Sequence, residues 1–202
     1  MFGLPPSTSL SRPLPKSAVY EKFGFKNAER EAFDRDISRM AIVAWVSPKT
    51  VPAIEVGAEV QDFYVIHLFL KLREFNTKHL LHLTKLIPQR MIFALEHDGE
   101  TQLAAVIDSH ILRSEWQPTE EVTISLDGLN LDTVWENIVT HIGNLQDIEG
   151  GNLSDKAQNQ DKRDKLQKQI TLLERQCRIE KQTRKKYELY QEIIRLKSKL
   201  KG

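Results

Sequence analysis

The last quarter of the chain is the feature that most constrains its fold. Residues 154–201 contain neither glycine nor proline and are rich in Lys, Gln, Glu, Arg and Leu. Glycine and proline are the residues that most disfavour a helix interior, and this composition is typical of long exposed helices, so the segment is predicted to be helical. Its 48 residues would extend roughly 70 Å as one helix, at about 1.5 Å per residue.

Apolar side chains recur along this segment in two runs with the four-three-four spacing of a helical seam. The first run is Leu166, Ile170, Leu173 and Cys177, and the second is Leu189, Ile193, Leu196 and Leu200. The runs are out of register, and the change falls between Ile179 and Lys186. Either a stutter shifts the seam along one continuous helix, or the chain reverses there and its halves form a helical hairpin. For one continuous helix, a homodimer through the seam is the simplest way to cover it.

Charge is divided unevenly along the chain, although the formal net charge is only +1. Residues 51–150 carry 6 Lys/Arg and 16 Asp/Glu, whereas residues 151–202 carry 15 and 7. Four basic residues fall at the register change, where a hairpin would present them at its tip: Lys181, Arg184, Lys185 and Lys186. Such a cluster favours phosphate binding, in DNA or RNA. The alternative is a solvated helical face paired with Glu180 and Glu188.

We expect the chain to have three parts. These are an extended proline-rich arm over residues 1–16, an α+β body over residues 17–150 and a basic helical tail over residues 151–202. The arm has four prolines from Pro5 to Pro15, and proline disfavours a helix. Gly150, Gly151 and Asn152 mark the boundary with the tail.

Four helices are predicted in the body. The first covers residues 18–23, with Ser17 as its cap and Gly24 at its end. The second is capped by Asn27, and its Phe33, Ile37 and Met40 share one face. A third begins at Asn76 or Thr77 and ends at Pro88, and a fourth covers residues 131–142 with Asp132 as its cap.

The predicted strands are residues 41–46, 63–70, 111–116 and 122–126, together with one hairpin. Residues 63–70 are apolar on both faces, which indicates a central position in a sheet. Asp98-Gly99 between the apolar runs 91–96 and 102–108 predicts the hairpin and its tight turn. Residues 49–59 are expected to be a connection with little regular structure. The fold class is therefore α+β, a mostly antiparallel sheet with helices on one face, followed by a long C-terminal helical tail.

Several classes of protein are excluded by simple criteria. The longest apolar stretches, such as residues 63–70, fall far short of the roughly 20 residues that a membrane-spanning helix needs. The first residues lack the basic and apolar regions of a secretory signal, so a cytoplasmic location without membrane contact is expected. Cys177 is the only cysteine, which excludes an internal disulfide and a multi-cysteine zinc site.

No set of residues specifies a reaction. His79 and His82 lie three apart on a predicted helix and could share a metal, but no third ligand is in view. Glu96, Asp108 and Lys71 are the best candidates for a nuclease, and their spacing does not match convergent carboxylates on neighbouring strands. We therefore expect no catalytic residues, no cofactor and no metal site.

Short segments along nearly the whole chain resemble the bacterial and archaeal domain of unknown function family 4391. They include Met1 to Pro5, Leu14-Pro15-Lys16, Ser47-Pro48, Ile87-Pro88 and, as the most specific part, Leu129 to Asn137. The resemblance implies no established catalytic residues. It does imply a genomic setting, because members of this family tend to be encoded beside DNA helicases and site-specific DNA methyltransferases of restriction-modification or phage-defence loci.

Three functions are expected from these observations, in decreasing order of support. The first is a non-enzymatic adaptor whose body docks a helicase or DNA methyltransferase while the tail self-associates or bridges to it. The second is a nucleic-acid-binding accessory that acts through Lys181, Arg184, Lys185 and Lys186. The third, an unrecognised nuclease, has the least support.

Overall fold

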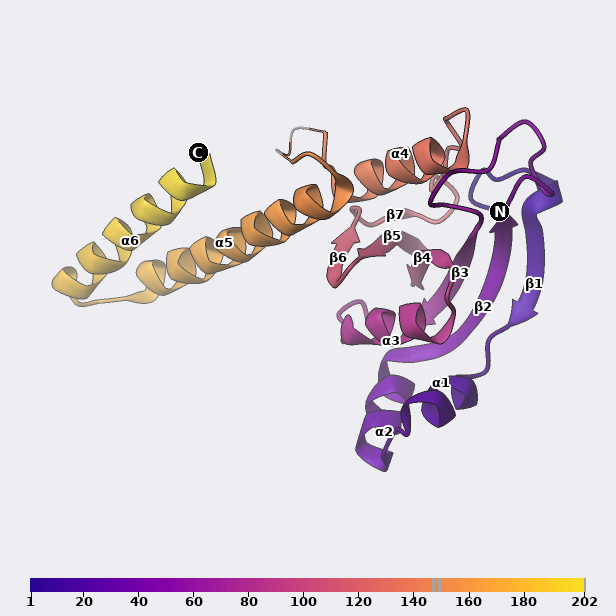
Figure 1. Cartoon of the computed structure of the whole chain (residues 1–202). Helices are drawn as coiled ribbons and strands as arrows, with labels where there is room; N and C mark the ends of the chain where they lie inside the picture. The colour runs from indigo at the N-terminus through magenta and orange to yellow at the C-terminus, as the bar shows by residue number, and fades with distance from the viewer. Residues whose placement is uncertain (147, 149, 202) are drawn as a thin grey trace. The chain divides into compact units, whose positions relative to one another are not determined.

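The computed structural model describes residues 1–146, 148 and 150–201 (Figure 1). The chain divides into two compact units, Met1–Asp147 and Ile148–Gly202. We call the first unit the body and the second the hairpin, and describe each by itself.

The body is built on one mixed sheet, which confirms the α+β class. Its seven strands, among the described residues, are β1 Ser9–Pro13, β2 Ile37–Val46, β3 Phe63–Leu70, β4 Arg90–His97, β5 Glu100–Ile107, β6 His110–Arg113 and β7 Gln117–Pro118. Strands β1 to β6 lie side by side in sequence order, and β7 pairs with β5. All pairs are antiparallel except β3 and β4, which are parallel because helix α3 (Lys78–Leu86) connects them as a crossover.

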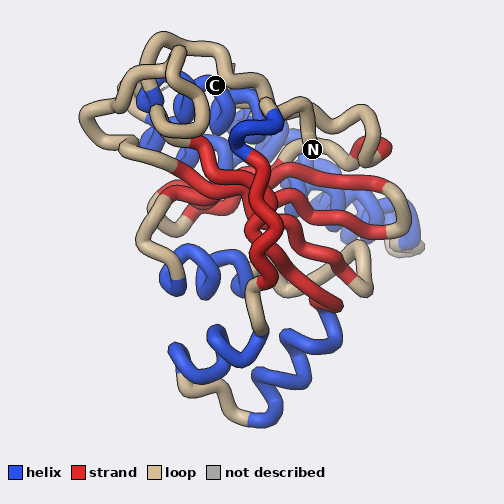
Figure 2. Tube along the Cα trace, turned by 90° about the vertical axis from the view of Figure 1, so that its right-hand side faces the viewer, coloured by secondary structure: helices blue, strands red, loops and turns tan. Residues whose placement is uncertain are grey.

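Helices cover both faces of this sheet, so the prediction of helices on one face was wrong. On one side lie α1 (Lys16–Phe23), α2 (Asn27–Asp36) and α3, and on the other lies α4 (Leu131–Gly143), as Figure 1 shows. In Figure 2 the strands form one layer, with the first three helices below it. Phe33 of α2 and Leu80 of α3 share a buried cluster with Ile66 of β3. Trp135 of α4 packs against Phe63 of β3, with ring centroids 5.6 Å apart.

The central strand and the tight hairpin are confirmed. Strand β3 is paired on both sides, and six of its eight residues are buried, as expected for apolar side chains on both faces. Strands β4 and β5 are joined by Asp98 and Gly99, whose φ angles of 47° and 80° are those of a tight type I′ turn. Glycine adopts positive φ without steric cost, which explains why this dipeptide marks the turn.

Two residues predicted on the second helix lie in a strand instead. Helix α2 ends at Asp36, and Ile37 and Met40 belong to β2. The register of β2 against β3 shifts between Ile37 and Arg39, which is a β-bulge. The bulge places Ile37 and Met40 in the same buried cluster although they are three residues apart. A spacing of three is typical of a helix, and for this reason the pattern was misread.

Three predicted helix caps were wrong by one to two residues. Helix α1 begins after Pro15 rather than Ser17, and α2 begins after Lys26 rather than Asn27. Helix α4 is capped by Asn130, whose Oδ1 accepts a hydrogen bond from the Thr133 N–H at 2.9 Å. Gly24 does end α1, with φ 60°.

Hydrogen bonds to Asp132 link the long connection between β2 and β3 to the start of α4. The Asp132 carboxylate accepts backbone N–H groups of Ala58 at 2.6 Å, Val60 at 2.7 Å and Glu59 at 3.1 Å. These hydrogen bonds, first that from Val60, hold the pKa of Asp132 below its usual value. Gly57 allows the close approach, because a Cβ there would lie 2.2 Å from the Asp132 Oδ1.

The predicted strand over residues 122–126 is not a strand. Val122 and Ile124 are buried and the residues between and after them are exposed or half-buried, but the segment pairs with no neighbouring strand. A backbone hydrogen bond joins the Ile124 N–H to the Phe2 carbonyl at 2.9 Å. The alternating apolar pattern of residues 122–126 therefore reflects burial of one side of an extended segment, without strand pairing.

The second unit is a helical hairpin, which decides between the two alternatives for the tail. Helix α5 covers Leu153–Ile179 and α6 covers Thr183–Lys201, with residues 180–182 as the turn. The helices run antiparallel, and a Glu174–Lys197 ion pair of 2.7 Å bridges them. No helix among the described residues is both long and apolar enough to cross a bilayer.

Candidate nucleic-acid interface

The predicted seam is the interior of the hairpin. Ile170, Ile193 and Leu196 are 1, 6 and 8% exposed, and Leu166, Leu173, Cys177 and Leu200 pack around them. Leu189 is half-buried nearer the tip. The seam residues thus have a partner within the chain, which removes the reason for which self-association was expected.

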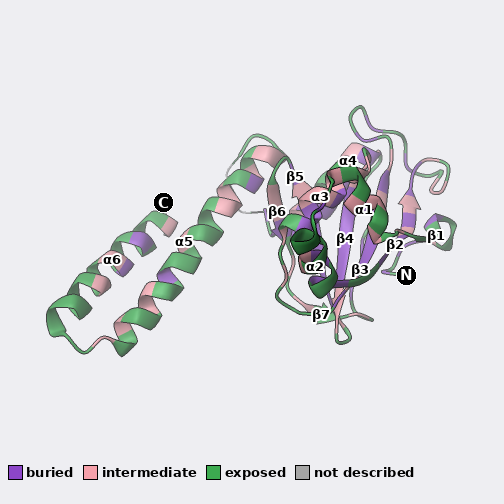
Figure 3. Ribbon diagram, turned by 90° about the horizontal axis from the view of Figure 1, so that it is seen from below, coloured by how far each residue is buried: buried purple, intermediate pink, exposed green. Residues whose placement is uncertain are grey.

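The turn of the hairpin gathers the four predicted basic residues. Lys181 lies in the turn itself, and Arg184, Lys185 and Lys186 lie in the first turn of α6. All four are exposed, and Figure 3 colours the start of α6 as exposed throughout. We call these four residues the basic tip. Over residues 175–186 the chain has six Lys/Arg and a single acid, Glu180.

Among the described residues, Arg184 is the only side chain of the basic tip that forms an ion pair. Glu180 accepts the Gln182 backbone N–H at 2.8 Å, and this hydrogen bond is the main cause of its lowered pKa. Glu188 pairs with Arg184 at 3.2 Å, but both side chains are exposed, and such surface pairs contribute little. Within the described part of the chain, Lys181, Lys185 and Lys186 form no salt bridge.

The start of α6 is an unfavourable place for these cations. The N-terminal end of a helix carries a partial positive charge, so acids are stabilising there and bases are not. The first turn of α6 has no acidic residue and three basic ones. Residues that oppose the helix dipole in this way are expected at sites where a ligand offsets the unfavourable charge. A bound anion at the start of α6 would offset it.

One side of the basic tip is a mixed-charge groove between the two helices, of 810 Å³. Its apolar lining includes Leu173, Ile179 and Leu189. Its polar lining includes two lysines, Lys181 and Lys185, and three glutamates, Glu180, Glu188 and Glu192. The positive charge on this side is therefore locally balanced.

Three large side chains of α6 remain exposed on its outward face. Tyr187, Tyr190 and Ile194 are 64, 53 and 46% exposed. Their spacing of three and four residues places them on one face of the helix. Sequence reasoning missed this stripe because it assigned only one seam to each half of the tail, although the spacing was visible there.

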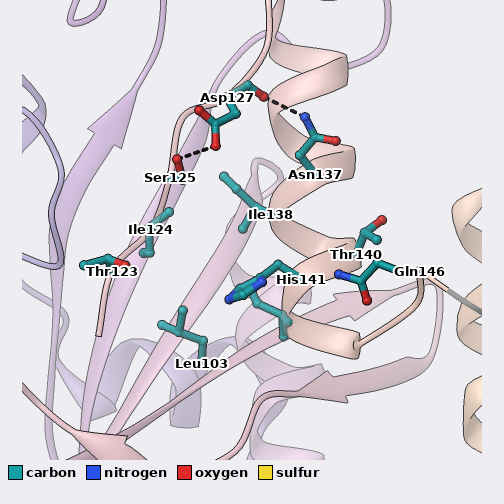
Figure 4. Close-up of a pocket in the computed structure, with 11 residues that line it drawn as sticks. Leu103, Thr123, Ile124, Ser125, Asp127, Asn137, Ile138, Thr140, His141 and Gln146 are labelled. Carbon is teal, nitrogen blue, oxygen red and sulfur yellow. Dashed lines mark hydrogen bonds between the residues drawn. The ribbon is translucent and has the colours of Figure 1, made fainter. Parts of the chain in front are cut away.

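The body has a pocket of 480 Å³ between α4 and residues 123–127, shown in Figure 4. The Ser125 hydroxyl donates to Asp127 at 2.6 Å, and the Asn137 amide donates to the Asp127 carbonyl at 2.8 Å. His141 also lines it, but in the described structure His141 forms no hydrogen bond with a hydroxyl or carboxylate there. Among the described residues of the pocket, no imidazole is hydrogen-bonded to a hydroxyl as in a base and nucleophile pair.

The two candidate nuclease carboxylates do not converge, although Lys71 follows β3 at the sheet end that carries Glu96. Glu96 lies opposite Thr101 near the start of β5, whereas Asp108 follows the other end of that strand. Glu96 instead contacts the buried His67, with Oε2 and Nε2 2.7 Å apart. Burial is the main effect on the pKa of His67 and lowers it, against the opposing effect of the Glu96 carboxylate.

The two candidate metal-binding histidines have separate structural contacts. His79 Nε2 lies 3.1 Å from the buried carboxylate of Asp36, and the His82 ring packs against Phe23 and Phe25 at 5.2 and 5.0 Å. Among the residues that the structure describes, no group of three or more His, Cys, Asp or Glu is placed to hold a metal ion.

Comparison with known proteins gives one family. No curated protein and no solved structure matches the chain significantly. The family model for a domain of unknown function, DUF4391, matches residues 2–200. Since the match covers nearly every residue, the chain belongs to the DUF4391 family.

Proposed function

We propose that this protein is a non-enzymatic accessory protein that holds nucleic acid through the basic tip of its hairpin. The observation that carries the proposal is the first turn of α6, where three cations and no acid occupy the positive end of a helix. Each such cation is disfavoured by about 0.3–1 kcal/mol in the absence of a counter-charge. A phosphate at this position reverses the sign of that interaction, because it meets both the cations and the helix end.

Nucleic acid is a suitable source of that phosphate. Its backbone offers a row of negative charges, and lysine and arginine side chains supply most of the affinity of sequence-independent binding. The four side chains of the basic tip are exposed and come from a turn and a helix end, so they can contact neighbouring phosphates of one strand.

The test is a comparison of two variants that lose the same number of positive charges. In the tip variant, Lys181, Arg184, Lys185 and Lys186 are changed to Gln. In the matched control, four exposed cations of α5 are changed to Gln: Lys162, Arg163, Lys165 and Lys168. Fluorescence anisotropy with a labelled oligonucleotide at low salt should show at least a tenfold weaker affinity for the tip variant and a smaller loss for the control. Equal losses, or no binding by the unchanged protein, would refute the proposal.

A second proposal is that the body acts as an adaptor for a DNA helicase or methyltransferase of a restriction-modification or phage-defence system. The acid excess of residues 51–150 supports it, because an acidic surface suits the basic surface of a DNA-handling partner. So does the genomic setting that is typical of the family. Affinity purification of the tagged protein from its native operon should recover such a partner. Recovery of the protein alone, without helicase, methyltransferase or nucleic acid, would contradict the adaptor role.

A further inference from the structure

We propose that the outward face of α6, formed by Tyr187, Tyr190 and Ile194, binds single-stranded nucleic acid, with the tyrosine rings stacked on unpaired bases. We call these three residues the tyrosine stripe. The inference rests on the proposed function and deepens it, because it names the form of nucleic acid that the hairpin prefers.

The tyrosine stripe is not used by the hairpin itself. Its neighbours along the chain, Leu189, Ile193 and Leu196, face α5 and are half-buried or buried. The stripe lies on another side of the helix and keeps about half of its surface in contact with solvent. Apolar and aromatic side chains that gather on one exposed helix face, rather than being scattered singly, form the kind of patch found at interaction sites.

The charged residues three or four positions from the tyrosine stripe are all positive. Positions three or four residues away are its neighbours on a helix surface. The exposed ones are Thr183, Arg184, Lys186, Gln191, Lys197 and Ser198. Three of these are cations and none is an acid. Arg184 and Lys197 have exposed ion pairs with Glu188 and Glu174, which a phosphate can replace at little cost.

These charges argue against a second copy of the hairpin on this face. Two copies would bring the same cations together, and like charges across an interface are destabilising. The length of the stripe argues against a partner helix. From Tyr187 to Ile194 it covers one heptad, or about 10 Å along the helix, whereas a stable coiled coil needs about three or four heptads.

Single-stranded nucleic acid fits both the rings and the charges. Proteins that bind it combine a positive surface along the backbone with aromatic rings on which successive bases stack. Two tyrosines three residues apart offer platforms for two bases, and Arg184, Lys186 and Lys197 lie beside them for the phosphates. A duplex cannot use these rings, since its bases are already stacked and paired.

The experiment separates stacking from charge in the full-length protein. Tyr187 and Tyr190 are both changed to Ala, or both to Phe, and affinity is measured for a single-stranded oligonucleotide and for the duplex of the same sequence. The Ala variant should bind the single strand about tenfold to a hundredfold more weakly and the duplex as before. The Phe variant should bind like the unchanged protein. Both tyrosines are exposed, so helicity by circular dichroism should stay the same in all variants.

Each other outcome is decisive. If the tip variant described above loses binding while the Ala variant binds both forms normally, the proposed function stands and the stacking inference fails. If no form of nucleic acid binds, both fail. If the Ala variant changes the sedimentation coefficient or loses only a co-purified acidic protein, then a second copy or a protein partner occupies the tyrosine stripe and the inference is overturned.

Discussion

At the scale of single residues, Asp36 shows how a buried carboxylate joins the end of α2 to the start of α3. It is 2% exposed, its Oδ2 accepts the Asn76 backbone N–H at 2.9 Å, and the His79 ring lies 3.1 Å from the same oxygen. Changing Asp36 to Ala removes the carboxylate partner of the part-buried Asn76 N–H and of the buried His79 ring. We expect the free energy of unfolding to fall by about 3 kcal/mol in urea denaturation.

Asp34 provides the control for this substitution, because it lies two residues away and is 51% exposed on its side chain. Its contacts with Lys16 and Tyr20 lie at the surface. Asp34→Ala should cost less than about 1 kcal/mol. Equal losses for the two variants would mean that the Asp36 contacts do not hold α3 in place.

Asp132 makes the stability of the body depend on pH. Its pKa is lowered in the folded state, so the carboxylate stabilises the fold above the pKa of the unfolded chain. That contribution is lost as the pH falls through the folded pKa. The difference in urea midpoint between the unchanged protein and Asp132→Asn should be constant above about pH 5 and shrink below about pH 4. A difference that grows in acid would contradict this sign.

At the scale of elements, two neighbouring substitutions in α6 test whether the buried seam stabilises the hairpin. Ile193 is 6% exposed and Ile194 is 46% exposed, although they are adjacent. Ile193→Ala should destabilise the hairpin by about 2–4 kcal/mol, and Ile194→Ala by less than about 1. Thermal melting followed by circular dichroism at 222 nm checks this order. The reverse order would place the other face of α6 at the interface.

The type of a helix, strand or turn was predictable from sequence where a pattern within a few residues determines it. The apolar run of β3, the Asp98-Gly99 turn and the helical tail are of this kind, because burial on both faces, positive φ angles and helix propensity each act within a few residues. The bulge in β2 was not predictable, since it depends on the pairing of β2 with β3.

Long-range contacts explain the other differences. Asp132 lies near the start of a helix, where a capping role is expected from sequence. Its carboxylate instead accepts hydrogen bonds from residues 58–60, which are distant in sequence. Of the candidate site, sequence reasoning could name the basic tip from its charge. It could not choose between one helix and two, because both arrangements are compatible with the register change at residues 179–186.

At the scale of the whole molecule, the body and the hairpin divide the charge and the proposed roles. The hairpin carries the basic tip and the tyrosine stripe. Most of the acid excess of residues 51–150 falls in the body, and among the body's described residues no group of three or more His, Cys, Asp or Glu is placed to hold a metal ion. This division supports the proposal of a protein that holds nucleic acid for another protein's chemistry.

The most direct test of nucleic-acid binding by the basic tip is the salt dependence of affinity. If four cations of the tip contact phosphates of a single strand, the logarithm of the association constant should fall with the logarithm of the salt concentration with a slope of about −3. In the variant with Gln at Lys181, Arg184, Lys185 and Lys186, the slope should lie between about −1 and zero. An unchanged slope in this variant, or no salt dependence in the unchanged protein, would contradict the central claim.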